Sequence, residues 1–185
     1  MAQPAHDLQQ PSAWVSRFAP LIAQGGRVVD VACGRGRHAR HLRSLGLSVV
    51  AIDRDGEALE TLRGLEGIEP VAADIESGPW PYTPGSFDGV VVTNYLWRPL
   101  LPQLIAALRE GGVLIYETFA LGNERYGRPA NPEFLLRRNE LLEWVLPQLQ
   151  VVAFEQGIVA RPWPAVVQRL CAVRADRDWG RLESA

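Results

Sequence analysis

The chain has 185 residues, of which 47% are hydrophobic and 22% are charged, with a net charge of −2 and a pI near 5.9. This length and composition predict one globular domain with an ample core, and the charge gives no electrostatic reason to expect a nucleic acid or an anionic membrane as partner. No run approaches the roughly 20 apolar residues that span a bilayer, and the first residues lack the basic start and apolar centre of a targeting signal. We therefore expect a cytoplasmic protein that keeps its two cysteines, Cys33 and Cys171, as reduced thiols.

The N-terminal segment, residues 1–25, is predicted to contain a helix because four apolar residues fall on one face at helical spacing. These residues are Trp14, Phe18, Leu21 and Ile22. Apolar residues recur at the same spacing ahead of Gly46 and Gly64, so two more helices are expected to end near these glycines.

Short runs rich in Val, Ile and Ala alternate with the predicted helices. Continuous apolar runs of this length are typical of strands that are covered on both faces, as in a parallel sheet between two layers of helices. The core predicted in this way, residues 26–119, contains the runs RVVDVA (27–32), LSVVAID (47–53), EPVAAD (69–74), FDGVVVTN (87–94) and GGVLIYETF (111–119).

After the fifth run the pattern changes. Residues 120–132 form a long polar connection, a candidate lid, and a helix is predicted around 139–146, so residues 120–148 are treated as one segment. The last segment, residues 149–175, contains two apolar runs separated by ARPWP, which is too short for a helical crossover and predicts antiparallel pairing. The expected fold is therefore α/β: a single, Rossmann-like, doubly wound, mostly parallel seven-stranded sheet with a C-terminal antiparallel hairpin.

The turn after the first run carries the strongest signal of a binding site. In an open parallel sheet, ligands bind beyond the carboxyl ends of the strands, near the point where the strand order reverses. Gly34 and Gly36 lie in this turn, and because they lack a Cβ they let backbone amides approach a ligand closely. Asp53 ends the second run, where its carboxylate can accept hydrogen bonds from a ribose diol. These features alone fit an NAD-dependent oxidoreductase as well as other nucleotide-binding proteins.

Further polar residues favour a different ligand. Asp30 lies inside the first run, where a buried carboxylate is costly unless it meets a cation such as a ligand ammonium. Asp74 ends the third run, where it can accept a hydrogen bond from an adenine amine while Ile75 covers the ring. Asn94 and Tyr95 follow the fourth run and are expected to face the same crevice. A dinucleotide leaves Asp74 without a role, whereas a ligand with an amino acid group, a ribose and an adenine engages every acid.

At these residues the chain resembles the class I S-adenosylmethionine-dependent methyltransferases, over nearly its whole length. The stretch DVACGRG (30–36) corresponds to the glycine motif of that family, with Ala32 in place of the first glycine. Within the class, the compact size and the stretch ETFALGNERYGRPANPEFLL are similar to the small bacterial methyltransferases of the tellurite-resistance and thiopurine-methyltransferase type. The resemblance implies a cofactor site made of Asp30, Ala32, Cys33, Gly34, Gly36, Arg37, Asp53, Arg54, Asp74, Ile75, Asn94 and Tyr95.

The resemblance also implies transfer of a methyl group from S-adenosylmethionine to a small-molecule acceptor by in-line displacement, with S-adenosylhomocysteine as the product. Tyr95 and Glu117 are the candidate catalytic residues, both expected to face the transferable methyl group. Glu117 either binds a cationic acceptor or takes its proton; the alternative is that it caps nearby backbone. Trp97, together with Trp14 and Trp163, is a candidate for the mouth of the pocket.

Arg37 is expected in the first turn of a helix, where a positive charge opposes the helix dipole. A nearby anion such as the methionine carboxylate of the cofactor would explain this position, and a surface salt bridge is the alternative. His38 and His41 lie one helical turn apart, but no further ligand has suitable spacing, so no metal site is expected. The other arginines of this stretch are expected on a solvated face rather than on a nucleic acid.

Two other classes of function remain open at this point. An NAD-dependent oxidoreductase would use the glycines and Asp53, and a non-catalytic protein would hold S-adenosylmethionine and act through a partner. The sequence does not identify the acceptor, the accepting atom or the oligomeric state.

Overall fold

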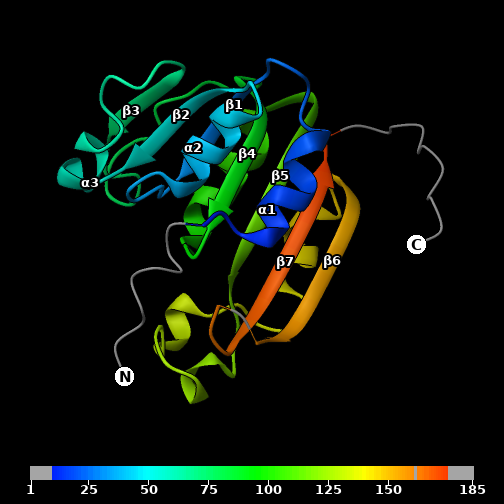
Figure 1. Ribbon diagram of the computed structural model, residues 1–185. Helices are drawn as coiled ribbons and strands as arrows, with labels where there is room; N and C mark the ends of the chain where they lie inside the picture. Colours follow the sequence, from blue (N-terminus) through cyan, green and yellow to red (C-terminus); the bar gives the residue numbers. More distant parts are fainter. Residues whose placement is uncertain (1–9, 161, 175–185) are drawn as a thin grey trace.

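A computed structural model describes residues 10–160 and 162–174 of the chain. Its centre is one sheet of seven strands, with helices packed on both faces (Figure 1). The strands are, in chain order, β1 (Arg27–Val31), β2 (Ser48–Asp53), β3 (Ile68–Ala72), β4 (Phe87–Thr93), β5 (Leu108–Phe119), β6 (Gln150–Val159) and β7 (Ala165–Val173). Their order in the sheet is β3-β2-β1-β4-β5-β7-β6.

Strands β1 to β5 are parallel, and β7 runs antiparallel between β5 and β6. The predicted fold is therefore confirmed, including the terminal hairpin. Because β1 lies between β2 and β4, the chain moves outward in one direction through β3 and then returns to build the other half of the sheet from β4. The strand order reverses between β1 and β4, where open sheets of this kind bind ligands.

The helices cover the two faces in separate groups. One face carries α1 (Ala13–Phe18), α2 (Arg37–Ser44) and α3 (Gly56–Glu60), and the other carries α4 (Leu101–Ala107) and α5 (Glu140–Val145). Short 3-10 turns complete the connections: η2 (Ala19–Leu21), η3 (Arg98–Leu100), η4 (Asn123–Arg125) and η5 (Pro132–Phe134).

The predicted helices are present, but two of them are shorter than expected. α3 ends at Glu60, and Leu62 is buried in the turn that follows it. α1 ends at Phe18, and the chain continues as a 3-10 turn. The expectation that Leu21 shares the buried face of Trp14 is wrong: Leu21 is 38% exposed because the tighter period of the 3-10 turn carries it away from that face.

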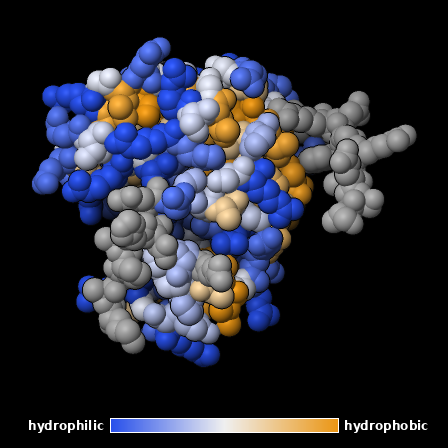
Figure 2. All heavy atoms as spheres, viewed as in Figure 1, coloured by the Kyte–Doolittle hydropathy of each residue, from blue (hydrophilic) through white to orange (hydrophobic). Residues whose placement is uncertain are grey.

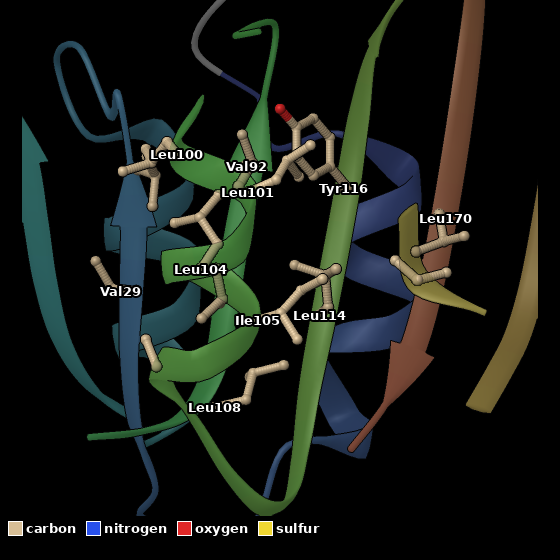
Figure 3. Close-up of a cluster of buried hydrophobic side chains, with 14 of the residues drawn as sticks. Val29, Val92, Leu100, Leu101, Leu104, Ile105, Leu108, Leu114, Tyr116 and Leu170 are labelled. Carbon is tan, nitrogen blue, oxygen red and sulfur yellow. The ribbon is translucent and has the colours of Figure 1, made fainter. Parts of the chain in front are cut away.

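Alternate side chains of the central strands pack on opposite faces, so the sheet lies between two buried layers. Val29 of β1, Val92 of β4 and Leu114 of β5 belong to the layer in which Leu104 and Ile105 of α4 pack (Figure 3). Their neighbours along the strands face the opposite layer, beneath α1 and α2: Val28, Val91 and Val113. This double burial holds the strand ends, and the polar residues that they carry, in fixed positions.

Beyond the carboxyl ends of β4 and β5 lies the segment 120–139 (Figure 1). In the view of Figure 2 the surface is mostly hydrophilic, and hydrophobic residues form separate patches, the clearest along the edge that holds β6 and β7 and at the upper left near β2 and β3. No helix among residues 10–160 and 162–174 is long and apolar enough to cross a membrane.

Candidate active site

The turn between β1 and α2 adopts backbone conformations that suit glycine. Ala32, Gly34 and Gly36 have φ angles of 53°, 54° and 75°, so three of five consecutive residues lie in the left-handed region. A Cβ on Gly36 would lie 2.4 Å from Cδ2 of Leu62, whereas a Cβ on Gly34 would meet no atom within 4 Å. Gly36 is therefore required for packing, and Gly34 leaves open space on the cavity side of the loop. Ala32 has a left-handed backbone conformation although it carries a Cβ, which makes this conformation strained. The methyltransferases that the chain resembles have glycine at this position.

The carboxylate of Asp53 fixes this turn. Its Oδ2 accepts the backbone N–H of Gly34 at 2.7 Å, and its Oδ1 accepts that of Asp55 at 2.9 Å. The sequence predicts Asp53 as a ribose ligand; the structure adds a second role, because the same carboxylate positions the glycine turn. Each carboxylate oxygen keeps a further lone pair for a ligand hydroxyl.

Asp74 is organised in the same way at the next strand end. Its carboxylate accepts the backbone N–H groups of Glu76 and Ser77 and the Ser77 hydroxyl, and the Ser77 hydroxyl is the main reason why the pKa of Asp74 is lowered. Asp74 and Asp53 both line a cavity of about 150 Å³. The remaining lining residues of this cavity are Ala32, Arg54, Ala73, Ile75, Glu76 and Tyr95.

Asp30 is the most unusual group of the site. Its side chain is 1% exposed in the middle of the sheet, and neither carboxylate oxygen forms a hydrogen bond of normal geometry with any described residue. Burial raises the pKa of Asp30 from the ordinary 3.8 to about 7, although the nearby Ala39 amide and the positive charge of Arg37 act in the opposite direction. A buried carboxylate that is not fully hydrogen-bonded is costly, and Asp30 itself lines none of the cavities at this edge of the sheet.

Arg37, the first residue of α2, lies between the two larger cavities. It lines a cavity of about 830 Å³ beside the glycine turn and another of about 530 Å³ on the side of β5 and β7. Desolvation lowers the pKa of Arg37, while Glu117 and Asp30 attract its charge. Arg37 forms no salt bridge with any described residue, so the alternative of a surface ion pair finds no support in this part of the chain.

Glu117 lies in the cavity of about 530 Å³, 8% exposed, and its side chain does not cap backbone. Instead, its Oε2 lies 2.5 Å from Nε of Arg169, directly opposite in the antiparallel register of β5 and β7. Sequence reasoning missed Arg169. Glu117 and Arg169 are opposite each other because Thr118 pairs with Gln168 in the antiparallel register of β5 and β7. Local sequence does not determine the register of a hairpin strand against β5, so this pairing could not be predicted.

Apolar residues form the rest of this cavity. They are Phe119, Val159, Pro162, Trp163, Ala165 and Val167, and residues 10–13, of which Gln10 and Ser12 are polar, complete the lining around the start of α1. Trp163 therefore lies at the cavity as predicted. Trp14 does not, because it is buried with its indole N–H donated to the Leu170 carbonyl, and Trp97 packs against the core of the α4 face.

Two predicted neighbours, Asn94 and Tyr95, diverge. Asn94 has a φ of 54° and lines both larger cavities. Tyr95 lines the small cavity with Asp74, and burial, together with the nearby Glu76 carboxylate, raises the pKa of its hydroxyl. The expectation that Tyr95 faces the same cavity as Glu117 is wrong. Asn94 has a left-handed backbone, and the next side chain, that of Tyr95, lies in the small cavity instead.

His38 and Cys33 lie close to the glycine turn and are both buried. His38 is buried: its Nε2 accepts the Ser12 backbone N–H at 3.1 Å, and its Nδ1 lies 3.1 Å from the Thr93 hydroxyl. Cys33 lines the cavity beside the turn as a free thiol whose pKa is raised well above its ordinary value by burial. Among the described residues, no group of three His, Cys, Asp or Glu side chains is placed to hold a metal.

The lid predicted over 120–132 remains a prediction. Asn123 ties this segment to the sheet, because its side chain donates to the Pro129 carbonyl and accepts the Val166 N–H. No residue of the segment lines the cavities described above, whose outer walls come from residues 10–13 and from the turn before β7.

Comparison with known sequences points in the same direction as this geometry. Residues 28–112 match the protein family described as "Methyltransferase domain". A ubiquinone biosynthesis O-methyltransferase of Burkholderia pseudomallei (strain 1710b) is 32% identical over 129 residues, covering 63% of this chain and 53% of that protein, and the protein of the same name from Burkholderia mallei gives the same values. The chain thus spans about half the length of the curated relatives it matches.

Solved structures share the fold. TehB from Haemophilus influenzae superposes with a TM-score of 0.72 at 18% identity, covering 87% of this chain and 61% of that chain. A second match is the geranyl diphosphate C-methyltransferase from Streptomyces coelicolor A3(2), crystallised with Mg²⁺, geranyl diphosphate and S-adenosyl-L-homocysteine. It superposes with a TM-score of 0.65 at 18% identity, covering 89% of this chain and 80% of that chain. Residues 28–112 therefore match the methyltransferase domain family, and the chain shares the fold of these solved structures.

Proposed function

We propose that this protein transfers a methyl group from S-adenosylmethionine to a small-molecule acceptor. The observation that carries the proposal is the buried carboxylate of Asp30, which is not fully hydrogen-bonded, next to a glycine turn at the point where the strand order reverses. A free amino acid ammonium is a group that this carboxylate would bind. The domain match and the curated relatives, which are named as O-methyltransferases, support the same reaction.

The residues at this edge of the sheet fit the cofactor. Asp30 would bind the ammonium, Arg37 the carboxylate, and Asp53 the ribose hydroxyls, while the open side of Gly34 accommodates the chain that links these groups. The small cavity would hold the adenine, with Asp74 at its amine and Ile75 and Tyr95 along the ring. The other members of the proposed cofactor site are Ala32, Cys33, Gly36, Arg54 and Asn94.

When bound, S-adenosylmethionine supplies an electrophilic methyl group on a sulfonium that already leaves readily. The work of the chain is therefore to align the acceptor and to exclude water, and alignment alone can lower a barrier by roughly 7 to 11 kcal/mol. Arg37 and Asn94 line both larger cavities and would orient donor and acceptor toward each other. Glu117 lies on the acceptor side as the candidate catalytic residue, and Tyr95 is reassigned to the adenine.

We also propose a cytoplasmic location and a small acceptor rather than a nucleic acid. Cys33 and Cys171 are both buried free thiols, which suits a reducing compartment. The cavity of about 530 Å³ matches the size of common small-molecule sites.

Calorimetric titration with S-adenosylhomocysteine tests the cofactor. Binding is expected, with stabilisation against unfolding of about 2.7 kcal/mol when the ligand is at 100 times its Kd, whereas NAD should give no heat. Binding of NAD instead would support the oxidoreductase alternative. A screen of acceptors with radiolabelled S-adenosylmethionine then separates an enzyme from a non-catalytic binding protein, which would bind the cofactor and label nothing.

A further inference from the structure

The cavity of about 830 Å³ beside the glycine turn has a wall of positive charge. Three arginines line it: Arg35 in the turn, and Arg37 and Arg40 in α2. Among the described residues that line this cavity there is no aspartate and no glutamate. His38 adds no charge to the wall, because burial lowers its pKa to about 3. The cavity therefore suits an anionic ligand, since guanidinium groups form strong hydrogen bonds with anions.

The three arginines are exceptions in their part of the chain. Residues 27–110 contain nine arginines, and six of them have a carboxylate oxygen within 3.9 Å. These six are Arg27, Arg43, Arg54, Arg63, Arg98 and Arg109. The other three, which have no such carboxylate among the described residues, are the three that line the cavity. Three positive charges without an ion-pair partner thus border the same space.

Thr61 connects the backbone of Arg35 with the side chain of Arg40. The Thr61 carbonyl, at the end of α3, accepts a hydrogen bond from Nη2 of Arg40, and the Thr61 hydroxyl lies 3.3 Å from the Arg35 carbonyl. The guanidinium of Arg35 forms no ion pair with any residue that the structure describes. Both side chains are exposed, and each keeps N–H groups for a ligand, because a guanidinium has five.

The cofactor accounts for only one of the three charges. In the proposed function, on which this step rests, Arg37 binds the single carboxylate of S-adenosylmethionine. Arg35 and Arg40 then remain without an anion. An acceptor beside Glu117 does not explain them, because neither arginine lines the cavity of about 530 Å³. The cavity that they do line lies within the range of roughly 300–1,000 Å³ found for small-molecule sites, so it has room beyond the amino-acid end of the cofactor.

We propose that Arg35 and Arg40 form a second anion site, which binds the phosphate dianion of a small molecule at the same time as the cofactor. A phosphate group carries nearly two negative charges and three acceptor oxygens, which match two guanidinium groups, whereas a carboxylate carries one charge and two oxygens. The phosphate and the cofactor carboxylate together balance the three arginines. A nucleic acid is disfavoured by the net charge of −2, since its backbone is held by many cations.

Calorimetric titration with inorganic phosphate and with phenyl phosphate tests this site. At pH 8 both probes carry close to two negative charges. Each is titrated into the free protein and into its complex with S-adenosylhomocysteine. We expect both to bind to the complex, and benzoate, which has a single charge, to bind at least fivefold more weakly than phenyl phosphate. Tighter binding of phenyl phosphate than of inorganic phosphate would identify the ligand as a phosphate ester, and equal binding would identify the free ion; either result supports the dianion site.

Three results would overturn the proposal. The first is that neither phosphate probe binds. The second is that the probes displace S-adenosylhomocysteine, because all three arginines would then serve the cofactor carboxylate. The third is that a short single-stranded RNA binds more tightly than phenyl phosphate. Failure of the proposed function gives a different pattern, in which the phosphate probes bind and S-adenosylhomocysteine does not.

Arg35→Gln is the most direct variant, because the Arg35 guanidinium forms no ion pair with a described residue and its loss should leave folding unchanged. This variant and Arg40→Gln should each weaken phenyl phosphate binding about fivefold, with less than a threefold change for S-adenosylhomocysteine. Arg43→Gln is the matched control on α2, since Arg43 pairs with Glu66 and lines none of the cavities described above. Its affinity for phenyl phosphate should stay within twofold of the parent. Unchanged affinity in both Arg35→Gln and Arg40→Gln would overturn the assignment.

Discussion

The two halves of the carboxyl edge of the sheet are built on different principles. At β1 to β3, backbone N–H groups close to the strand ends donate to the carboxylates of Asp53 and Asp74. The shape of the loops at this edge is therefore set by hydrogen bonds, most of which join residues close together in the sequence. At β5 and β7, two oppositely charged side chains from strands far apart in the chain meet in an ion pair beside a cavity, with Oε2 of Glu117 2.5 Å from Nε of Arg169. The first half is shaped by hydrogen bonds from backbone to carboxylates, and the second half by a contact between two charged side chains.

Because the two halves are built differently, amino-acid substitutions in one half should affect different properties of the protein from substitutions in the other. Changes around the glycine turn should alter folding and cofactor binding, whereas changes at β5 and β7 should alter acceptor chemistry and leave S-adenosylhomocysteine binding nearly intact. The following variants test this separation, beginning with the largest expected effect.

Gly36→Ala should lower the free energy of unfolding by about 3 kcal/mol. The new Cβ would overlap Leu62, which is fully buried, and alanine would also be held at a φ of 75°. Gly34→Ala is the matched control, because its Cβ meets nothing within 4 Å and only the left-handed conformation costs about 1 kcal/mol. Urea unfolding of both variants measures the difference, and equal losses would contradict the packing role of Gly36.

Arg169→Met should lower the free energy of unfolding by about 2 kcal/mol, because it leaves the Glu117 carboxylate buried without its cation. Cavity water limits the loss to less than that of a fully enclosed pair. Adding Glu117→Gln to Arg169→Met should recover at least half of the loss, which chemical denaturation of the single and double variants measures. Cofactor affinity should stay within about twofold of the parent, and a larger change would break the separation of the two halves.

Asp30→Asn should weaken S-adenosylhomocysteine binding about 20-fold, since a charged hydrogen bond contributes about 1.5–3 kcal/mol. The variant should also flatten the pH dependence of stability. The folded pKa of about 7 lies above the ordinary 3.8, so the Asp30 contribution is complete below pH 3.8 and is lost as the pH rises through 7. Unfolding measured between pH 5 and pH 8 without ligand should therefore show a smaller decline in Asp30→Asn than in the parent. An identical decline would show that Asp30 does not titrate in this range.

Arg37→Gln should have the smallest effect, a loss of about fivefold in S-adenosylhomocysteine affinity, because the guanidinium is only half-buried and solvent weakens its interaction with a carboxylate. Arg43→Gln is the control on the same helix, since Arg43 is held by the Glu66 carbonyl and lines none of the cavities. Isothermal titration compares the two variants. Equal affinities would separate Arg37 from the cofactor carboxylate.

The nucleoside half was predictable from the sequence because its signals are local. Asp53 and Asp74 each end an apolar run, and Gly34 and Gly36 follow another, so their meeting at one edge follows from parallel strands alone. The parallel strands and the terminal hairpin follow from the same alternation of apolar runs and helices, whereas the order of the strands in the sheet comes from the structure. The hydrogen bond by which Asp53 holds the glycine turn could not be predicted from the sequence. An aspartate at this position could bind a ligand whether or not it forms that hydrogen bond.

The acceptor half was predictable only in part. Glu117 was found because it ends a strand, but its partner Arg169 depends on the register between β5 and β7, which tertiary packing decides. Tyr95 follows a left-handed residue, Asn94, and lines the small cavity with Asp74 rather than the cavity of Glu117, so only its expected position beside the acceptor was wrong, while its place in the cofactor site stays a prediction. Such a turn is uncommon for a residue other than glycine and leaves no periodic trace in the sequence.

The buried ring of His38 has a practical implication for preparing this protein. It tethers Ser12 to the end of β4 through its two nitrogens, and the residues around Ser12 form one wall of the acceptor-side cavity of about 530 Å³. An affinity tag fused close to this tether, or trimming of the chain up to α1, would therefore disturb substrate recognition while sparing the nucleoside-binding edge. Purification handles are better attached elsewhere.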